Sequence, residues 1–306
     1  MPKSKLVTGL ALGGGGARGF VHIGVLRELE NTLFKPQIIS GTSIGSVIGA
    51  MYAATVDTHW IENRFKNFIK SNEFKELGLD RLADTPREDQ SFFQMASSFV
   101  KDRIQINIAN ERMGILKSDR LRSALKYLLP VEQFSELKLP FYCTAVDLHS
   151  GEDVIFSEGN LLDAVLASSS IPGYIQPVSW GNKLLTDGGV SRPIPGKLVR
   201  NMGSEFTIGV CAGLRKFNRL NELNMVLVLG RAEQITTTRL ANECRADVDI
   251  FLEPDTLDLF WADFSHLKTL INNGRDTVKT NIDRIQKAFN MKIGFVSRVK
   301  KMFTQT

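Results

Sequence analysis

The sequence predicts an α/β fold in which helices cover a central, mostly parallel β-sheet. The first 60 residues alternate between strand-like and helix-like patterns in the order β, α, β, α, which is typical of such a sheet. A glycine-rich turn follows each of the first two predicted strands, where the chain passes into a helix. No repeat or low-complexity linker divides the chain, so we expect a single domain over residues 1–285 and a basic tail over residues 286–306.

Apolar spacing defines the elements of the N-terminal part. In the first predicted helix Val21, Val25 and Leu29 recur every fourth residue, which forms a stripe for packing on the sheet. We expect strands at residues 6–12 and 38–40, and helices at residues 17–32 and from residue 43 onward.

The middle of the chain, residues 58–129, is more polar and its pattern is helical. Within it, residues 91–104 carry apolar side chains that favour a core helix; a lid or a lipid-contacting helix is the alternative. Beyond this region we expect strands at 140–148 and 152–156, a helix at 161–168, a hairpin of strands at 174–179 and 183–186, strands at 205–211 and 247–252, and helices over 266–288.

Composition limits the class of protein. With 306 residues and 43% hydrophobic content, the chain can bury a sizeable core. The formal net charge is +5, and the three cysteines are too widely spaced for a disulfide framework or a CxxC metal site, which favours a reducing compartment. No apolar run approaches the roughly 20 residues of a membrane-spanning helix, and the first one leads into a glycine loop and an amphipathic helix. We therefore expect a cytoplasmic protein without a signal peptide, membrane-spanning helix, metal ion, other cofactor or nucleic-acid partner.

A serine occupies the second glycine-rich turn. Gly41, Ser43 and Gly45 form the pattern GxSxG between a predicted strand and a predicted helix. On such a sharp turn the serine side chain projects from the sheet, and the two glycines remove side chains that would collide. The free amides of the following helix point back at the turn and favour negative charge there. This context predicts a nucleophile elbow; a serine that only caps the helix is the alternative.

The first glycine-rich turn, GGGGARG at residues 13–19, matches the nucleotide-binding pattern GxGxxG. A dinucleotide site needs an acidic residue at the end of the second strand, where this chain has Ser40 and Gly41, and a Walker loop needs a lysine before a serine or threonine. Neither kind of phosphate site is supported. A row of glycine amides beside a serine nucleophile is instead suited to an oxyanion hole. Arg18 would brace the loop or add positive potential, unless it is a solvated surface arginine.

A serine nucleophile needs a base. None of His22, His59, His149 and His266 stands in a context that singles it out. Asp187, in the sequence TDGG at the end of a predicted strand, is the stronger candidate, although Asp-Gly most often marks a β-turn. Burial would raise its basicity, and a short hydrogen bond to the serine would offset the difference in pKa.

Together these motifs resemble the bacterial patatin-like phospholipase family. The similarity rests on the glycine run at 14–19, the elbow at 41–45 and the aspartate motif at 187–189, in that order, and residues 140–178 also resemble the stretch that leads into the aspartate in bacterial members. It extends to about residue 280 and so covers nearly all of the chain.

The resemblance implies a patatin-like α/β fold and a Ser–Asp dyad that hydrolyses acyl esters of phospholipids and other lipids without calcium. Ser43 would attack the ester carbonyl and Asp187 would act as the base. The backbone amides of Gly14, Gly15 and Gly16 would hold the oxyanion, and Arg18 would steady the loop. This chain departs from the family pattern in one respect, because Ile44 and Ser46 stand where a small alanine is frequent.

Two other functions remain open at this point. An α/β-hydrolase with a Ser43-Asp187-His266 triad would show the same chain order, although Ser43 comes very early and His266 lies in a helical context. A non-catalytic lipid-binding protein could also retain the fold.

The basic tail has two interpretations. Val296, Val299 and Phe303 would line one face of a helix that Arg298, Lys300 and Lys301 flank. Such a helix could lie on an anionic membrane, as peripheral contact for a lipid-directed protein. A solvated helix is the alternative.

Overall fold

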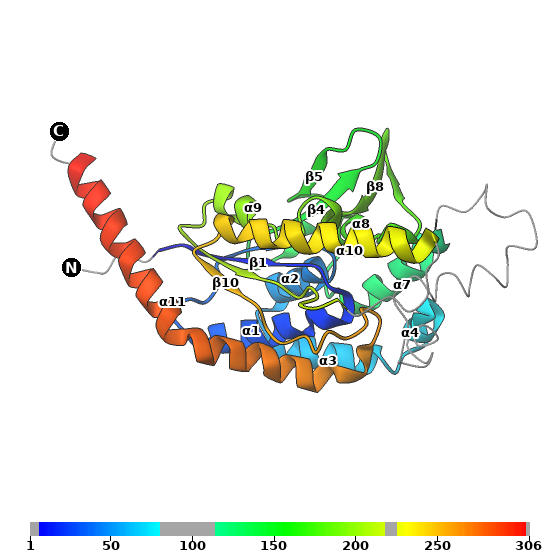
Figure 1. The fold of residues 1–306 in the computed structure, drawn as a ribbon, viewed down its shortest axis with the longest axis horizontal. Coiled ribbons are helices and arrows are strands. Elements are labelled where there is room, and N and C mark those ends of the chain that lie inside the picture. The colour runs from blue at the N-terminus through cyan, green and yellow to red at the C-terminus, as the bar shows by residue number, and fades with distance from the viewer. Residues whose placement is uncertain (1–5, 80–113, 218–224, 304–306) are drawn as a thin grey trace, which may run out of the picture.

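The computed structural model describes residues 6–79, 114–217 and 225–303 (Figure 1). The predicted apolar helix at residues 91–104 lies outside the described residues. Within them the predicted α/β fold class is confirmed, because parallel strands alternate with helices along the N-terminal part of the chain.

Most strands fall close to their predicted positions, but a short strand at 114–116 lies in the region predicted to be helical, and the predicted strand at 174–179 is divided into two. The strands are β1 Thr8–Leu12, β2 Ile38–Gly41, β3 Gly114–Leu116, β4 Phe141–Asp147, β5 Asp153–Phe156, β6 Gly173–Ile175, β7 Val178–Trp180, β8 Lys183–Asp187, β9 Phe206–Val210 and β10 Ile250–Leu252.

The helices are α1 Val21–Leu29, α2 Ile44–Thr55, α3 Thr58–Phe68, α4 Asn72–Leu77, α7 Ser118–Leu128, α8 Leu161–Ser168, α9 Gly196–Asn201, α10 Met225–Glu243 and α11 Leu267–Phe303. Short 3₁₀ turns occur at Gly16–Phe20, Phe134–Glu136, Gly188–Val190, Cys244–Asp247 and Phe264–His266. The first predicted helix therefore starts as a 3₁₀ turn, and α9 and α10 have no counterpart among the sequence-based predictions.

In the described part of the chain, eight strands form one sheet with the order β10-β9-β1-β2-β4-β8-β7, and β5 pairs with β4. The strands from β10 to β4 are parallel, whereas β5, β7 and β8 are antiparallel to their neighbours. The turns after β1 and β2 lie side by side, because Leu12 pairs with Gly41 at the carboxyl end of both strands.

Helices cover both faces of the sheet. The side chains of β1 alternate between them, so that Leu10 and Leu12 join the larger core while Ala11 joins a second one. The larger core contains residues of α1, α2, α3, α7, α8 and α11, and the second contains residues of α9 and α10. Figure 1 shows α10 crossing one face while α1, α3 and α11 run along the other.

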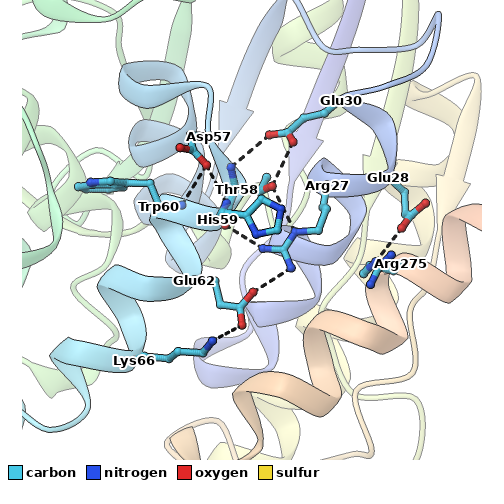
Figure 2. A network of polar contacts seen from close by, with 10 residues as sticks. All are labelled: Arg27, Glu28, Glu30, Asp57, Thr58, His59, Trp60, Glu62, Lys66 and Arg275. Atoms are coloured by element: carbon cyan, nitrogen blue, oxygen red, sulfur yellow. Dashed lines mark hydrogen bonds and ion pairs between the residues drawn. The ribbon is translucent and has the colours of Figure 1, made fainter.

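Polar contacts fasten α1 between α3 and α11 (Figure 2). Arg27 of α1 forms an ion pair with Glu62 of α3 at 2.8 Å and donates to the carbonyl oxygen of Thr58 at 3.0 Å. In α11, Nε of Arg275 donates to Glu28 of α1 at 2.7 Å. These contacts fix the helix that begins directly after the glycine-rich loop.

Two glycines bring α1 and α11 into backbone contact. A Cβ atom at Gly24 would lie 1.9 Å from the carbonyl oxygen of Ile271, and one at Gly274 would lie 2.1 Å from that of Val21. Side chains at either position would force the helices apart, so glycine is required for this close approach.

The C-terminal helix α11 is continuous from Leu267 to Phe303, and its far end extends away from the other elements (Figure 1). The predicted boundary at residue 285 falls inside this helix, and the division into a domain and a tail stays a prediction. Among the described residues, no helix is both long enough and apolar enough to cross a membrane.

Candidate active site

The turn between β2 and α2 holds Ser43 in a strained conformation. Its backbone has φ 55 and ψ −128, although it is not a glycine. Positive φ is uncommon for such residues and persists only where the surroundings enforce it, frequently at functional sites. A Cβ atom at Gly41 would lie 2.3 Å from the carbonyl oxygen of Gly45, and one at Gly45 would lie 2.2 Å from that of Leu12. Both flanking glycines are therefore required by the turn.

Neighbouring elements hold this turn in place. The Ser43 amide donates to the carbonyl oxygen of Ser168 at 3.1 Å, at the end of α8. Ser46 Oγ donates to the Ser43 carbonyl oxygen at 2.6 Å, and the side chain of Ile44 packs where a Cβ atom on Gly19 would stand. Ser46 and Ile44 thus brace the elbow and fill the space beside the glycine loop.

The antiparallel edge of the sheet brings Asp187 to Ser43. β4 extends beyond the end of its neighbour β2, and β8 runs back along this extension so that Asp187 pairs with Ala145. The Ser43 side chain lies near enough to Asp187 to lower the pKa of its carboxyl group, and only 7% of Ser43 and 5% of Asp187 is exposed. The two residues that the sequence predicted as a dyad therefore meet in the structure.

Burial controls the protonation of Asp187. Loss of solvation raises the pKa of its carboxyl group to about 7 and outweighs two opposing hydrogen bonds, from Ser43 and from the amide of Gly189 at 2.7 Å. The negative charge of Glu233 on α10 raises the pKa further. A carboxylate with a pKa near 7 is a much stronger base than an ordinary aspartate.

The amides of the glycine loop are used in different ways. Gly13 donates to Val210 at 3.0 Å and Gly14 donates to Pro193 at 3.1 Å, so both amides are engaged by carbonyl oxygens. Within the described residues, the amides of Gly15 and Gly16 have no hydrogen-bond acceptor. Of the three amides expected to hold an oxyanion, these two are free to do so.

The side chains of an arginine and a histidine contact carbonyl oxygens of the same loop. Nε of Arg18 donates to Gly15 at 3.1 Å, which is the contact that a bracing role requires. Burial lowers the pKa of Arg18 to about 10, so the guanidinium stays charged at neutral pH. His22 is completely buried and its Nε2 donates to the carbonyl oxygen of Gly13 at 2.8 Å. Burial lowers the pKa of His22 to about 4, which keeps this imidazole neutral.

The contact made by His22 was not predicted from the sequence. The sequence does place His22 on the buried face of the first helix, because residues 22, 25, 26 and 29 follow the spacing of one helix face and the other three are apolar. A histidine on a buried face needs a hydrogen-bond partner, and here the glycine loop supplies it.

The alternative base, His266, lies in a different environment. Its Nε2 is 3.7 Å from Oδ2 of Asp263, three residues earlier in the chain. The hydrogen bonds and ion pairs of the described residues include none between His266 and either Ser43 or Asp187. In the described part of the chain, no group of three His, Cys, Asp or Glu side chains is arranged to hold a metal ion.

Comparisons with known proteins point to one family. Residues 10–199 match the model of the family described as patatin-like phospholipase. An uncharacterised NTE family protein of Mycobacterium tuberculosis is 31% identical over 204 residues, which is 66% of this chain and 48% of that protein. Human patatin-like phospholipase domain-containing protein 6 is 30% identical over 206 residues, 67% of this chain and 13% of that protein. The chain thus spans about half the length of its mycobacterial relatives.

Among solved structures, human GIVD cytosolic phospholipase A2, crystallised with a fluorophosphonate inhibitor and terbium chloride, aligns with a TM-score of 0.50 at 12% sequence identity. The alignment covers 95% of this chain and 60% of the human protein. At that level of identity the likeness concerns the fold alone.

Proposed function

The chain belongs to the patatin-like phospholipase family, and from this premise we propose that it is a serine hydrolase of lipid acyl esters, with phospholipids or lysophospholipids as substrates. The observation that carries the proposal is the placement of the buried Asp187 beside Ser43, which stands on its strained turn and lowers the pKa of the Asp187 carboxyl group. A nucleophile in direct contact with a base of raised pKa is the arrangement that acyl transfer requires.

In the proposed acylation step, Ser43 Oγ attacks the carbonyl carbon of the ester while Asp187 accepts the hydroxyl proton. The resulting oxyanion receives hydrogen bonds from the amides of Gly15 and Gly16. The amide of Ile44, the first residue of α2, is also unpaired in the helix and adjoins the nucleophile. Each such donor is worth about 10² to 10³ in rate.

Collapse of the tetrahedral intermediate breaks the bond to the alcohol, which leaves with the proton from Asp187. Asp187 is then ionised again and accepts a proton from water, which attacks the acyl group on Ser43. A second collapse releases the fatty acid and restores the Ser43 hydroxyl. The same carboxyl group thus serves as base and acid in both halves of the reaction, and no calcium ion takes part.

The proposal is tested by fatty-acid release from mixed phospholipid vesicles with EDTA present, together with labelling by a fluorophosphonate. We expect release that EDTA does not reduce, and a phosphonate adduct on the peptide that contains Ser43. Ser43→Ala should release nothing and stay unlabelled. Folded wild-type protein that neither releases fatty acid nor reacts with the probe would favour a non-catalytic lipid-binding protein.

We also propose that the far end of α11 contacts the surface of an anionic membrane. Met291 and Phe295, one helical turn apart, are 62% and 65% exposed, and the sequence beyond them adds Arg298, Lys300 and Lys301. Exposed apolar side chains beside basic ones are the pattern of a helix that lies in the lipid interface.

Co-sedimentation with anionic vesicles tests this contact. The double variant Met291→Ser, Phe295→Ser should bind several-fold more weakly than wild type, because it loses apolar area in the interface. Leu33→Ser is the control, since Leu33 is 68% exposed on a different part of the surface. Equal binding by all three proteins, or equal binding to neutral vesicles, would dismiss the contact.

A further inference from the structure

The nucleophile elbow and the turn after Asp187 are joined by the hydroxyl group of Thr42. Thr42 directly precedes Ser43 and is completely buried. Its Oγ1 donates to the carbonyl oxygen of Arg192 at 2.8 Å and lies 3.2 Å from Oγ1 of Thr144 on β4. A buried hydroxyl group thus connects the backbone of one catalytic loop to the backbone of the other.

The residue that receives this hydrogen bond belongs to a closed turn. The amides of Arg192 and Ser191 both donate to the carbonyl oxygen of Gly188, at 2.8 and 3.2 Å. Gly188 itself packs against β4, because a Cβ atom there would lie 2.3 Å from the carbonyl oxygen of Thr144. A displacement of the Arg192 carbonyl group would therefore be transmitted to Gly188 and so to Asp187.

Asp153 of β5 holds the same turn from the outside. Its two carboxylate oxygens accept hydrogen bonds from Oγ of Ser191 and Nε of Arg192. The pair is charged and only partly exposed, with side-chain exposure of 34% for Arg192 and 20% for Asp153. Charge-assisted contacts of this kind fix orientation more strongly than neutral ones.

We propose that Thr42 and Asp153 are positioning residues, which hold the Asp187 turn at hydrogen-bonding distance from Ser43. The kinetic consequence rests on the proposed hydrolase function, whereas the positioning itself does not. Neither side chain touches the reacting atoms. Both would act by fixing the distance between Ser43 and Asp187. Acyl transfer is sensitive to this distance, because a misplacement of about 1 Å can reduce the rate on the order of a hundredfold.

Thr42→Val tests the proposal, since valine keeps the shape of threonine and removes the donor. We expect kcat for a p-nitrophenyl ester to fall tenfold or more with little change in KM, and Thr42→Ser to restore most of it. Thr207→Val is the matched control. Thr207 lies on β9, away from the dyad; it is equally buried, and its Oγ1 lies 3.0 Å from Oγ of Ser204. Asp153→Asn, at a partly exposed position, should lower kcat in the same direction by a smaller factor.

A measurement on the resting protein separates positioning from turnover. The carboxyl group of Asp187 faces Ser43, the amide of Gly189 and the charge of Glu233, and the Ser43 hydrogen bond lowers its pKa. Weakening that bond should raise the pKa of Asp187 in Thr42→Val and, less strongly, in Asp153→Asn, but not in Thr207→Val. Titration of a ¹³C-labelled aspartate carboxyl signal by NMR reports this pKa directly.

The outcomes are distinct. A higher pKa of Asp187 in Thr42→Val and Asp153→Asn, with Thr207→Val unchanged, supports the proposal whether or not the protein hydrolyses the ester. Unchanged pKa values in both variants overturn it, as does an equal loss of kcat in Thr207→Val. A wild-type protein that titrates as expected but hydrolyses nothing counts against the proposed function and leaves the positioning contact standing.

Discussion

Replacing Asp187 with asparagine is expected to abolish ester hydrolysis and, at the same time, to stabilise the folded protein at pH 8. Both effects follow from one feature, the burial of a carboxyl group that is 5% exposed and whose pKa is raised to about 7. Above pH 7 this carboxyl group is ionised in a poorly solvated site. The proposed reaction requires the ionised group, but the fold does not, and its burial lowers the free energy of unfolding.

The sign of the stability effect follows from proton linkage. The folded-state pKa of Asp187 lies above the unfolded value of 3.8, so its contribution to stability is complete below pH 3.8 and is lost as the pH rises through about 7. This difference in pKa lowers the free energy of unfolding at pH 8 by about 4 kcal/mol. Asparagine carries no charge and should recover part of it.

His22 acts in the opposite direction. Its folded-state pKa of about 4 lies below the ordinary value of 6.5, so its contribution is present above pH 6.5 and is lost as the pH falls towards 4. In wild type the two groups oppose each other between pH 4 and 6.5. In Asp187→Asn the opposing contribution of Asp187 is absent, so across that window the free energy of unfolding should change more positively with pH than it does in wild type.

Urea unfolding of wild type and Asp187→Asn at several pH values between 4 and 8 measures these slopes. Esterase assays on the same samples should show a loss of at least about 10³ in kcat for Asp187→Asn, as expected for removal of a base that works as a unit with its nucleophile.

His266→Ala should keep nearly full activity. A loss in His266→Ala comparable to that of Ser43→Ala would establish the triad instead. An Asp187→Asn variant less stable than wild type at pH 8 would contradict the conclusion that the buried, ionised carboxylate destabilises the fold.

A methyl group at Gly14 is expected to lower kcat about tenfold to a hundredfold while the fold stays intact. A Cβ atom built there lies 3.3 Å from Cβ of Ser43, and its next neighbour is the carbonyl oxygen of Thr42 at 3.8 Å. The nucleophile is therefore what the added methyl group would displace. The backbone of Gly14 is not left-handed, so alanine adds no strain of its own.

Gly16→Ala provides the contrast for this prediction. Gly16 has φ 59, and a Cβ atom there would lie 2.3 Å from the carbonyl oxygen of Trp261, so alanine at this position should distort the loop and lower Tm. Steady-state kinetics with a p-nitrophenyl ester and thermal melts separate the two variants. Full activity in Gly14→Ala would show that the glycine loop need not approach Ser43 during turnover.

Most of the fold was predictable because its signals are local. The strands and glycine turns of the first 60 residues follow from apolar spacing and from turns that only glycine permits, and the structure places β1, β2 and α2 close to the predicted ranges. The helix α10 was not predicted. Its sequence carries no clear apolar stripe, and its placement depends on contacts with the rest of the fold, which local sequence does not encode.

The candidate site divides in the same way. By itself the sequence predicted the elbow around Ser43, the glycine loop beside it and Asp187 as the preferred partner, because each is a short motif whose backbone geometry depends on its own residues. Only the tertiary structure decided which amides of the loop are free, that His22 holds the loop, and that Thr42 joins the Ser43 turn to the turn after Asp187. It also decided the raised pKa of Asp187, since desolvation depends on every element that packs around the carboxyl group rather than on its neighbours in the chain.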